Sequence, residues 1–374
     1  MTSTQGHDEV RFAIVGTGLM GIEHIRNLKL RPDVRIAALC DPVKKSLERA
    51  RTALGDDASG VAEFSDCGAF VAAAKSRLQV DAVIVASPNH THHEVLKLLF
   101  GTRLHILCEK PLCTTLDDAR RIAEAADAHT RTTGGVFSVG MEYRYMPPVS
   151  EFIARVKAGE VGKLRMLAIR EHRFPFLPKV GDWNRFSRNT GGTMVEKCCH
   201  FFDLMRFIVG AEPVRLYCSG AMDVNHQDER YAGEKPDIID NSYTIVDFAN
   251  GARAMLDLCM FAEGSQNQEE IAAVGDLAKL EVLIPDGDLI FSPRVGFAGK
   301  KIERRHVAVE QALLGAGHHH GATYFQHEAF LAAIRGRSAV EVSANDGLRA
   351  VAMGVAAEHS AQEKKVVEIP RLGD

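Results

Sequence analysis

The feature that most constrains the fold is a regular alternation of short apolar runs and helical patterns between Arg11 and Met141. The apolar runs end in Gly or polar residues, which is typical of strands that are buried on both faces. They lie at residues 11–16, 34–41, 80–86, 104–109 and 136–141, and the helical patterns between them lie at 21–30, 42–54, 91–100 and 115–130. This alternation predicts a doubly wound parallel sheet of the α/β class.

The strand–helix alternation of the sequence ends near Pro147. Beyond it, residues 241–248 and 252–261 read as longer strands joined across Asn250-Gly251, which is a strong hairpin signal. Helices at 324–334 and 345–360 and a short strand at 366–369 close the chain. We therefore expect two domains, 1–146 and 147–374, the second built on an open, mostly antiparallel sheet. The C-terminal segment can return to pack on the first domain.

Composition sets the broad class of the protein. A chain of 374 residues with 46% apolar and 25% charged residues suits a soluble protein of two domains. The net charge of -4 and the lack of Lys or Arg runs argue against a nucleic-acid or membrane-surface partner. The segment from Met1 to Val10 has no apolar signal core, and the eight cysteines include no CxxC pair. These features predict a reduced, cytoplasmic protein.

A glycine-rich loop, Gly16-Thr17-Gly18-Leu19-Met20-Gly21, directly follows the first apolar run and opens the first helical pattern. In that context, the glycines permit a tight turn, a close approach of backbone to a pyrophosphate, and packing of helix on strand. Asp41 ends the next strand 20 residues after Gly21, where a carboxylate binds ribose hydroxyls and repels a 2′-phosphate. We expect NAD as the cofactor. NADP is the alternative, because Lys44 and Lys45 follow closely.

Three further residues suggest alcohol chemistry. Lys110 follows an apolar strand, at the edge where such sheets bind ligands, and Glu196 and His200 are four residues apart. Positions four apart share one face of a helix, so we expect Glu196 and His200 to point at one substrate. A cationic donor, a titratable base and an orienting carboxylate are what proton removal from an alcohol requires.

Four ordered signatures make the chain resemble the Gfo/Idh/MocA oxidoreductase family. The family's G-x-G-x-x-G-x-x-H pattern is matched by Gly16 through His24, and its G-G-x-x-x-D-x-G-x-H-x-x-D pattern by Gly191 through Asp203, with Glu196 in place of the usual Asp. Its P-N-x-x-H and E-K-P patterns are matched by Pro88, Asn89, His92, Glu109, Lys110 and Pro111. The resemblance implies a Rossmann domain, a second domain with an open sheet, a nicotinamide cofactor and a homodimer or homotetramer. It also implies that Ser87, Pro88, Asn89, His92, Glu109 and Lys110 contribute to the cofactor site.

Candidate substrate residues lie on two segments. Arg144 and Tyr145 follow the last strand of the first domain, and Trp183 and Arg185 lie on a polar loop before the Glu196 helix. We interpret these as walls of the substrate cleft, together with Glu196 and His200. The run His318-His319-His320 suggests a metal site, but consecutive histidines cannot all face one ion from regular structure. We therefore predict no metal site and interpret these histidines as substrate-facing or solvated loop residues.

Together these features predict an NAD-dependent dehydrogenase of a sugar, a sugar derivative or a cyclitol. Lys110 stabilises the developing alkoxide, His200 accepts the proton, and Glu196 orients the substrate or the imidazole. Three alternatives stay open: a glycoside hydrolase that uses NAD for transient oxidation, a non-catalytic regulator that senses dinucleotide or sugar, and a reductase that runs the same chemistry in reverse.

Overall fold

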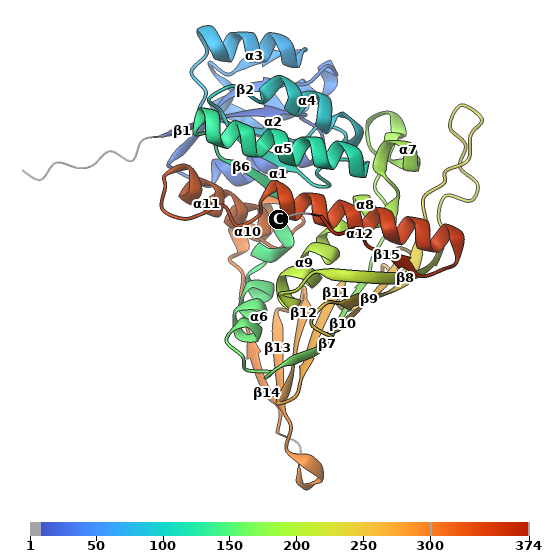
Figure 1. The fold of residues 1–374 in the computed structure, drawn as a ribbon. Coiled ribbons are helices and arrows are strands. Elements are labelled where there is room, and N and C mark those ends of the chain that lie inside the picture. Colours follow the sequence, from blue (N-terminus) through green and yellow to red (C-terminus); the bar gives the residue numbers. More distant parts are fainter. Residues whose placement is uncertain (1–8, 300, 373–374) are drawn as a thin grey trace, which may run out of the picture.

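Six parallel strands form the first sheet of the computed structural model, which describes residues 9–299 and 301–372 (Figure 1). The strand order is β3-β2-β1-β4-β5-β6, the order of a Rossmann sheet. The strands are β1 (Val10–Val15), β2 (Val34–Cys40), β3 (Ala62–Phe64), β4 (Ala82–Val85), β5 (His105–Glu109) and β6 (Phe137–Gly140). The predicted parallel sheet is confirmed. The expectation that the N-terminal segment has no apolar signal core concerns mainly residues 1–8, which lie outside the described residues.

Helices cover both faces of this sheet and form two separate apolar cores. One core contains residues of α1 and α2 with Phe330 and Leu331, and the other contains residues of α3, α4 and α5 with Val351. The helices are α1 (Leu19–Lys29), α2 (Lys44–Leu54), α3 (Cys67–Ser76), α4 (His92–Leu99) and α5 (Leu116–Thr133). The short β3 and α3 escaped the sequence analysis. A three-residue strand has too few positions for a periodic pattern.

Nine strands form the second sheet, in the order β14-β13-β12-β11-β7-β10-β9-β8-β15. All neighbouring pairs are antiparallel except β7 and β10. The strands are β7 (Leu164–His172), β8 (Pro213–Ala221), β9 (Asn241–Phe248), β10 (Arg253–Cys259), β11 (Glu269–Gly275), β12 (Ala278–Ile284), β13 (Asp288–Pro293), β14 (Glu303–His306) and β15 (Val367–Glu368). The predicted hairpin at Gly251 is confirmed, since this glycine has a φ of +83° between β9 and β10.

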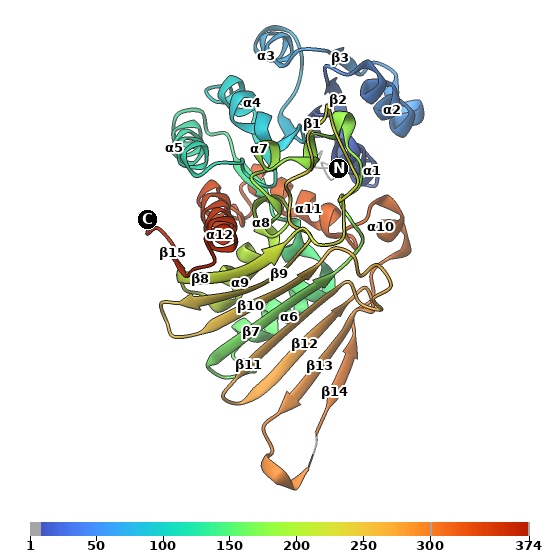
Figure 2. The same ribbon diagram turned by 90° about the vertical axis from the view of Figure 1, so that its right-hand side faces the viewer.

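One face of the second sheet is packed, and the other is open. Residues of α6 (Pro147–Lys157) and α9 (Cys199–Val209) share an apolar core with the inward-facing residues of β7, β9, β10, β11 and β12. Figure 2 shows this sheet from its opposite side, where no helix lies over the strands. The side chains of β11 alternate between buried and partly exposed along its length, as a half-covered sheet requires.

The C-terminal helices return to the first domain. Besides α10 (Gln311–Ala316), they are α11 (Ala322–Ile334) and α12 (Ala344–Glu363), and α12 runs between the two sheets (Figure 1). Leu348 and Val351 of α12 belong to a core of the first sheet, whereas Met353 and Ala356 belong to the core of the second. The short helices near the site are α7 (Ser187–Thr190), α8 (Thr193–Glu196) and the 3₁₀ helices η2 (Asn89–Thr91), η3 (Glu142–Tyr145) and η4 (Val180–Arg185). Within the described chain, no helix combines the length and apolar character needed to cross a bilayer.

Candidate functional site

A cleft of about 640 Å³ lies at the carboxyl edge of the parallel sheet, and the glycine-rich loop forms part of it. The three glycines have different reasons to lack a side chain. A Cβ on Gly16 would lie 2.4 Å from backbone atoms of Ala86, and one on Gly21 would lie 2.2 Å from the Gly16 carbonyl oxygen. A Cβ on Gly18 would meet no atom, because it would project into open space beside the cleft. The loop and the start of α1 therefore leave room for a phosphate group against backbone N–H groups.

Asp41 lines the same cleft at the end of β2. Its Oδ2 accepts hydrogen bonds from Thr17 N at 2.8 Å and Thr17 Oγ1 at 3.2 Å, and its Oδ1 accepts one from Val43 N at 2.8 Å. These bonds fix the carboxylate while leaving lone pairs for ribose hydroxyls. Lys44 and Lys45 are exposed and do not line the cleft. The residues present therefore fit NAD.

The other predicted cofactor residues divide into two groups. Those that line the cleft are Gly16, Gly18, Leu19, Met20, Asp41, Ser87, Pro88, Asn89, Glu109 and Lys110. Thr17 and Gly21 of the loop do not line the cleft: Thr17 donates its hydrogen bonds to Asp41, and Gly21 packs against the Gly16 carbonyl oxygen. His92 is fully buried, and its two ring nitrogens lie 2.9 Å from the Pro111 carbonyl oxygen and 3.0 Å from that of Ser87. The expectation that His92 contacts the cofactor is therefore wrong. His92 instead links the two loops that follow β4 and β5.

Lys110 lies at the inner end of the cleft, and buried groups hold it there. Glu109 Oε2 accepts a hydrogen bond from Lys110 N at 3.2 Å, and Glu109 Oε1 lies 2.9 Å from His24 Nε2. The Lys110 ammonium donates to the Glu196 carbonyl oxygen at 3.3 Å. Burial opposes the ammonium charge, but Cys199, Glu142, Glu109 and Glu196 outweigh it and raise the pKa of Lys110 above its ordinary value. Lys110 is thus a permanent cation and hydrogen-bond donor.

Glu196 and His200 do not share one helix face, which corrects the sequence analysis. Helix α8 ends at Glu196 and α9 begins at Cys199. The cause is a widened turn, in which Cys198 N donates to the Thr193 carbonyl oxygen five residues back, at 3.2 Å. The extra residue rotates His200 away from the Glu196 carboxylate. Glu196 Oε1 instead accepts a hydrogen bond from Lys179 at 2.9 Å.

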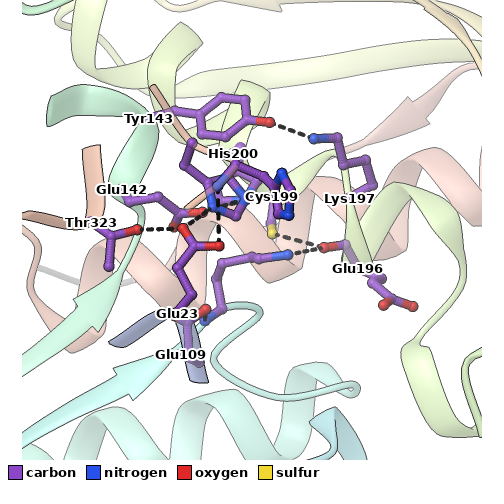
Figure 3. A network of polar contacts seen from close by, with 12 residues as sticks. Glu23, Glu109, Glu142, Tyr143, Glu196, Lys197, Cys199, His200 and Thr323 are labelled. Atoms are coloured by element: carbon purple, nitrogen blue, oxygen red, sulfur yellow. Dashed lines mark hydrogen bonds and ion pairs between the residues drawn. The ribbon is translucent and has the colours of Figure 1, made fainter. Parts of the chain in front are cut away.

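His200 is buried against aromatic and charged side chains (Figure 3). Its ring stacks on Tyr143, with 4.1 Å between ring centroids and an interplanar angle of 9°. Its Nε2 lies 3.5 Å from Glu142 Oε1, and its Nδ1 has no hydrogen-bond partner among the described residues. Burial, followed by the positive charges of Lys110, Lys197, His319 and Arg173, lowers the pKa of His200 well below its ordinary value. The imidazole is therefore neutral near pH 7.

A buried ionic network supports Tyr143 from behind. Lys197 donates to Tyr143 Oη at 2.6 Å and lies 2.9 Å from Glu171 Oε1. Glu269 Oε1 accepts from Tyr143 Oη at 3.2 Å, and Arg173 donates to Glu171 at 3.2 Å. This network ties β7, β11 and the α8–α9 turn to the hydroxyl group of Tyr143, whose ring stacks on His200. It fixes the plane on which the imidazole lies.

The predicted substrate residues are only partly together. Trp183 lines the cleft, and Lys179, beside it in the cleft wall, lies 4.5 Å from the centroid of the Trp183 ring. Arg144 does not reach the cleft, because Asp203 and the Glu341 carbonyl oxygen accept its hydrogen bonds. Tyr145 packs against the apolar cores of both sheets. Arg185 is buried and donates to Glu229 at 3.0 Å. The expectation that Arg144, Tyr145 and Arg185 bind substrate is therefore wrong. These residues pack in the interior or anchor loops.

Three groups near His200 escaped the sequence analysis: Glu142, His319 and Glu23. Glu142 lies in η3, two residues before Arg144, and no spacing or motif in the sequence indicates that it faces the site. His319 belongs to the run interpreted above as substrate-facing or solvated, but the sequence does not indicate which of the three histidines lies near Glu142. Its side chain turns inward to Glu23 of α1, with 2.7 Å between His319 Nδ1 and Glu23 Oε1, whereas His318 is exposed. No pattern in the sequence indicates that these segments meet.

Comparison with known proteins covers nearly the whole chain. The model of the NAD-binding Rossmann fold of the GFO_IDH_MocA oxidoreductase family matches residues 10–137, and that of the family's C-terminal alpha/beta domain matches residues 153–369. Myo-inositol 2-dehydrogenase of Thermotoga maritima is 25% identical over 369 residues, which cover 97% of this chain and 99% of the relative. Inositol 2-dehydrogenase of Rhizobium meliloti is 26% identical over 372 residues, which cover 96% and 99% of the two chains.

Solved structures show the same fold. An oxidoreductase domain protein from Kribbella flavida superposes with a TM-score of 0.82 at 21% identity, over 97% of this chain and all (100%) of the other. Levoglucosan dehydrogenase in complex with NADH also gives a TM-score of 0.82, at 19% identity, over 97% and 100% of the two chains. The family models, the cleft and its glycine-rich loop agree on NAD as the cofactor. The chain belongs to the Gfo/Idh/MocA family of NAD-binding oxidoreductases.

Proposed function

We propose that this protein is an NAD-dependent dehydrogenase that oxidises a secondary alcohol of a cyclitol, a sugar or a sugar derivative. The observation that carries the proposal is that Lys110 lines the cofactor cleft while His200 is buried behind it, near enough for the Lys110 charge to lower the pKa of the imidazole. One is a permanent cation, and the other is a buried neutral imidazole with an unpaired Nδ1. The names of the two full-length relatives support the substrate class, since both are inositol 2-dehydrogenases.

Each residue has a distinct part in this proposal. The Lys110 ammonium donates to the reacting hydroxyl oxygen and stabilises its developing negative charge. His200 accepts the hydroxyl proton, which requires the neutral imidazole that its lowered pKa provides. Bound NAD supplies the acceptor for the carbinol hydride. Glu196, which is paired with Lys179 beside Trp183, fits a role in substrate binding better than one in orienting the imidazole.

The test is a panel of inositols, sugars and sugar acids with NAD and with NADP, read by the absorbance of the reduced nicotinamide. We expect sustained NAD reduction with at least one cyclitol or sugar and a preference for NAD. Cleavage of a glycoside without net NADH would instead support the transient-oxidation hydrolase. Binding of dinucleotide without turnover of any substrate in either direction would support a regulator and refute the proposal.

We also propose a homo-oligomer that forms through the open face of the second sheet. Tyr243 and Ile245 of β9 are 62% and 52% exposed, and Met255 and Tyr217 lie opposite Ile245 on the strands at either side. A contiguous apolar patch of this kind marks an interface. Light scattering should give a dimer or tetramer, and Tyr243→Arg should shift it toward monomer. The eight free thiols support a cytoplasmic location, because such cysteines persist in reducing compartments.

A further inference from the structure

The Glu142 carboxylate is buried between two imidazoles. Its Oε1 lies 3.5 Å from His200 Nε2 and 3.6 Å from His319 Nε2, and its side chain is 1% exposed. Neither of its oxygens has a hydrogen-bond partner among the described residues. An unpaired buried carboxylate is costly, so its retention at this point requires a reason. Figure 3 shows Glu142 facing His200 at the centre of the network.

The proposed oxidation gives such a reason, because each turnover releases one proton inside the protein. His200 cannot pass this proton directly to solvent, since it is 1% exposed and one face of its ring is covered by Tyr143. Its Nε2 faces Glu142, the nearest group able to accept a proton. Lys110 cannot accept it, because the raised pKa keeps Lys110 protonated.

His319 forms the outer end of this arrangement. Its side chain is 21% exposed, whereas that of Glu23 is 7% exposed. Glu23 Oε1 lies 2.7 Å from His319 Nδ1 and accepts a hydrogen bond from Thr323 Oγ1 at 2.9 Å. A Cβ on Gly317 would lie 2.4 Å from the Glu23 carboxyl group, so the loop that carries His319 packs closely on Glu23. The ring of His319 is thereby held with its Nε2 toward Glu142.

We propose that Glu142 and His319 form a proton-transfer chain that carries the substrate's proton from His200 to solvent. The inference rests on the proposed function, in which His200 is the base. As the substrate O–H bond breaks, a bond forms from the proton to His200 Nδ1. The His200 Nε2–H bond then breaks as the Glu142 Oε1–H bond forms, and that bond breaks as the proton bonds to His319 Nε2. His319 returns to neutral by losing one proton to water, and His200, left with its hydrogen on Nδ1, exchanges this proton for one at Nε2 before the next turnover.

The charges around the chain favour this direction of transfer. Lys110, Lys197 and Arg173 surround His200 and, after burial, depress its pKa. Burial and the nearby charge of Glu109 raise the pKa of Glu142 to about 7. Burial lowers the pKa of His319, but Glu23 and Glu142 outweigh it and raise the pKa above its ordinary value. Glu142 therefore holds the proton more tightly than His200, and the raised pKa of His319 favours its acceptance of the proton from Glu142 whenever the imidazole is neutral.

The first test is the pH dependence of alcohol oxidation. Wild-type turnover should fall on the acidic side of pH 7, because protonated Glu142 cannot accept. Glu142→Gln should lower the plateau by at least about tenfold and remove this limb, leaving only a fall well below pH 6.5 from His200. In His319→Ala, turnover should drop and then recover with added imidazole, which replaces the missing acceptor. His318→Ala is the matched control, since its exposed ring should leave rate and pH profile unchanged.

Two further measurements separate proton transfer from a structural defect. In Glu142→Gln, the solvent deuterium isotope effect on turnover should rise, while the effect of deuterium at the substrate carbon should fall. In the cofactor-free protein labelled with ¹⁵N-histidine, NMR titration should show a lower pKa for His319 in Glu142→Gln than in wild type, because a negative neighbour is lost. Thermal melting shows whether each variant is folded. Glu142→Asp, which keeps a titratable group, should recover part of the rate.

The outcomes distinguish a failure of the proton-transfer chain from a failure of the proposed function. Wild-type turnover in His200→Asn would overturn the proposed base and the chain together. Loss of turnover in His200→Asn, with normal rate, pH limb and buffer response in Glu142→Gln and His319→Ala, would overturn the chain alone. A folded His319→Ala that loses turnover without recovery in imidazole, and an unchanged His319 titration in Glu142→Gln, would equally count against proton transfer.

Discussion

Replacement of Glu142 by Gln should stabilise the protein, and more at high pH than at low pH. Burial raises the pKa of this carboxyl from 4.5 to about 7, so folding favours its protonated form. A group of this kind reduces stability as pH rises from the unfolded pKa to the folded one, because the native state then binds more protons than the unfolded state. The reduction is small near pH 5 and complete above pH 7.

The size of the effect follows from the two pKa values. Proton linkage gives a loss of roughly 1 kcal/mol at pH 5 and roughly 3 kcal/mol at pH 8 for wild-type Glu142. Gln has nearly the same shape and carries no charge at either pH. The stabilisation of Glu142→Gln relative to wild type should therefore be roughly 2 to 3 kcal/mol larger at pH 8 than at pH 5.

Urea unfolding at both pH values, followed by fluorescence or circular dichroism, measures this difference. Glu124→Gln is a suitable control, because Glu124 is exposed on α5 and its replacement should change stability equally at the two pH values. A Glu142→Gln variant whose advantage is the same at pH 5 and pH 8, or larger at pH 5, would show that Glu142 is ionised in the folded protein near neutrality. The pKa of Glu142 would then be too low to cause the fall in turnover on the acidic side of pH 7 that the proton chain predicts.

Four further outcomes are expected. Asp41→Ser should shift the ratio of kcat/KM for NADP over NAD upward by about tenfold or more, and a wild-type preference for NADP would remove Asp41 as the ribose reader. Lys110→Ala should lose roughly two to four powers of ten in turnover with little change in NAD affinity, so a change of only a few-fold would make the lysine structural. Glu196→Gln should raise KM and leave the acidic limb in place, whereas a displaced limb would mean that Glu196 acts on the imidazole. Gly192→Ala should lower the free energy of unfolding by more than about 1 kcal/mol in urea unfolding, and by clearly more than Gly251→Ala. Both glycines have positive φ, but only a Cβ on Gly192 would lie 2.2 Å from a carboxylate oxygen. Equal losses in the two variants would contradict the steric clash.

The parts of the site that depend on local sequence could be predicted. The glycine-rich loop, Asp41 and Lys110 each follow an apolar strand of the parallel sheet, so their position at its carboxyl edge follows from strand pattern alone. Glu196 and His200 show the limit of spacing arguments. Two residues that are four positions apart share one face only in a regular helix. Here the hydrogen bond from Cys198 N to the Thr193 carbonyl oxygen adds a residue to the turn.

The parts that depend on long-range packing could not be predicted. Glu142 and His319 meet only because the segment before α11 folds back against α1 and η3, and a loop histidine gives no periodic signal of where it will face. The prediction for Arg144 is wrong for the same reason. Its position after a sheet strand suggested a cleft residue, but Asp203 of α9 and the backbone at Glu341 hold its guanidinium elsewhere. The Glu341 backbone lies beside Arg144 because the chain returns to the first domain just before α12. No local pattern in the sequence indicates this return.

That return of the chain has a consequence for how the protein can be made. The Val342 carbonyl oxygen accepts hydrogen bonds from Val139 N at 3.1 Å and Ser138 Oγ at 3.2 Å, so the outermost strand of the first sheet receives its last partner from a segment more than half the chain away. During synthesis, the cofactor-binding half emerges from the ribosome with the edge of β6 and part of its core uncovered until α12 has been translated. Expression of residues 1–146 alone should thus yield an aggregating fragment, and co-expression with a peptide spanning residues 338–372 should restore solubility.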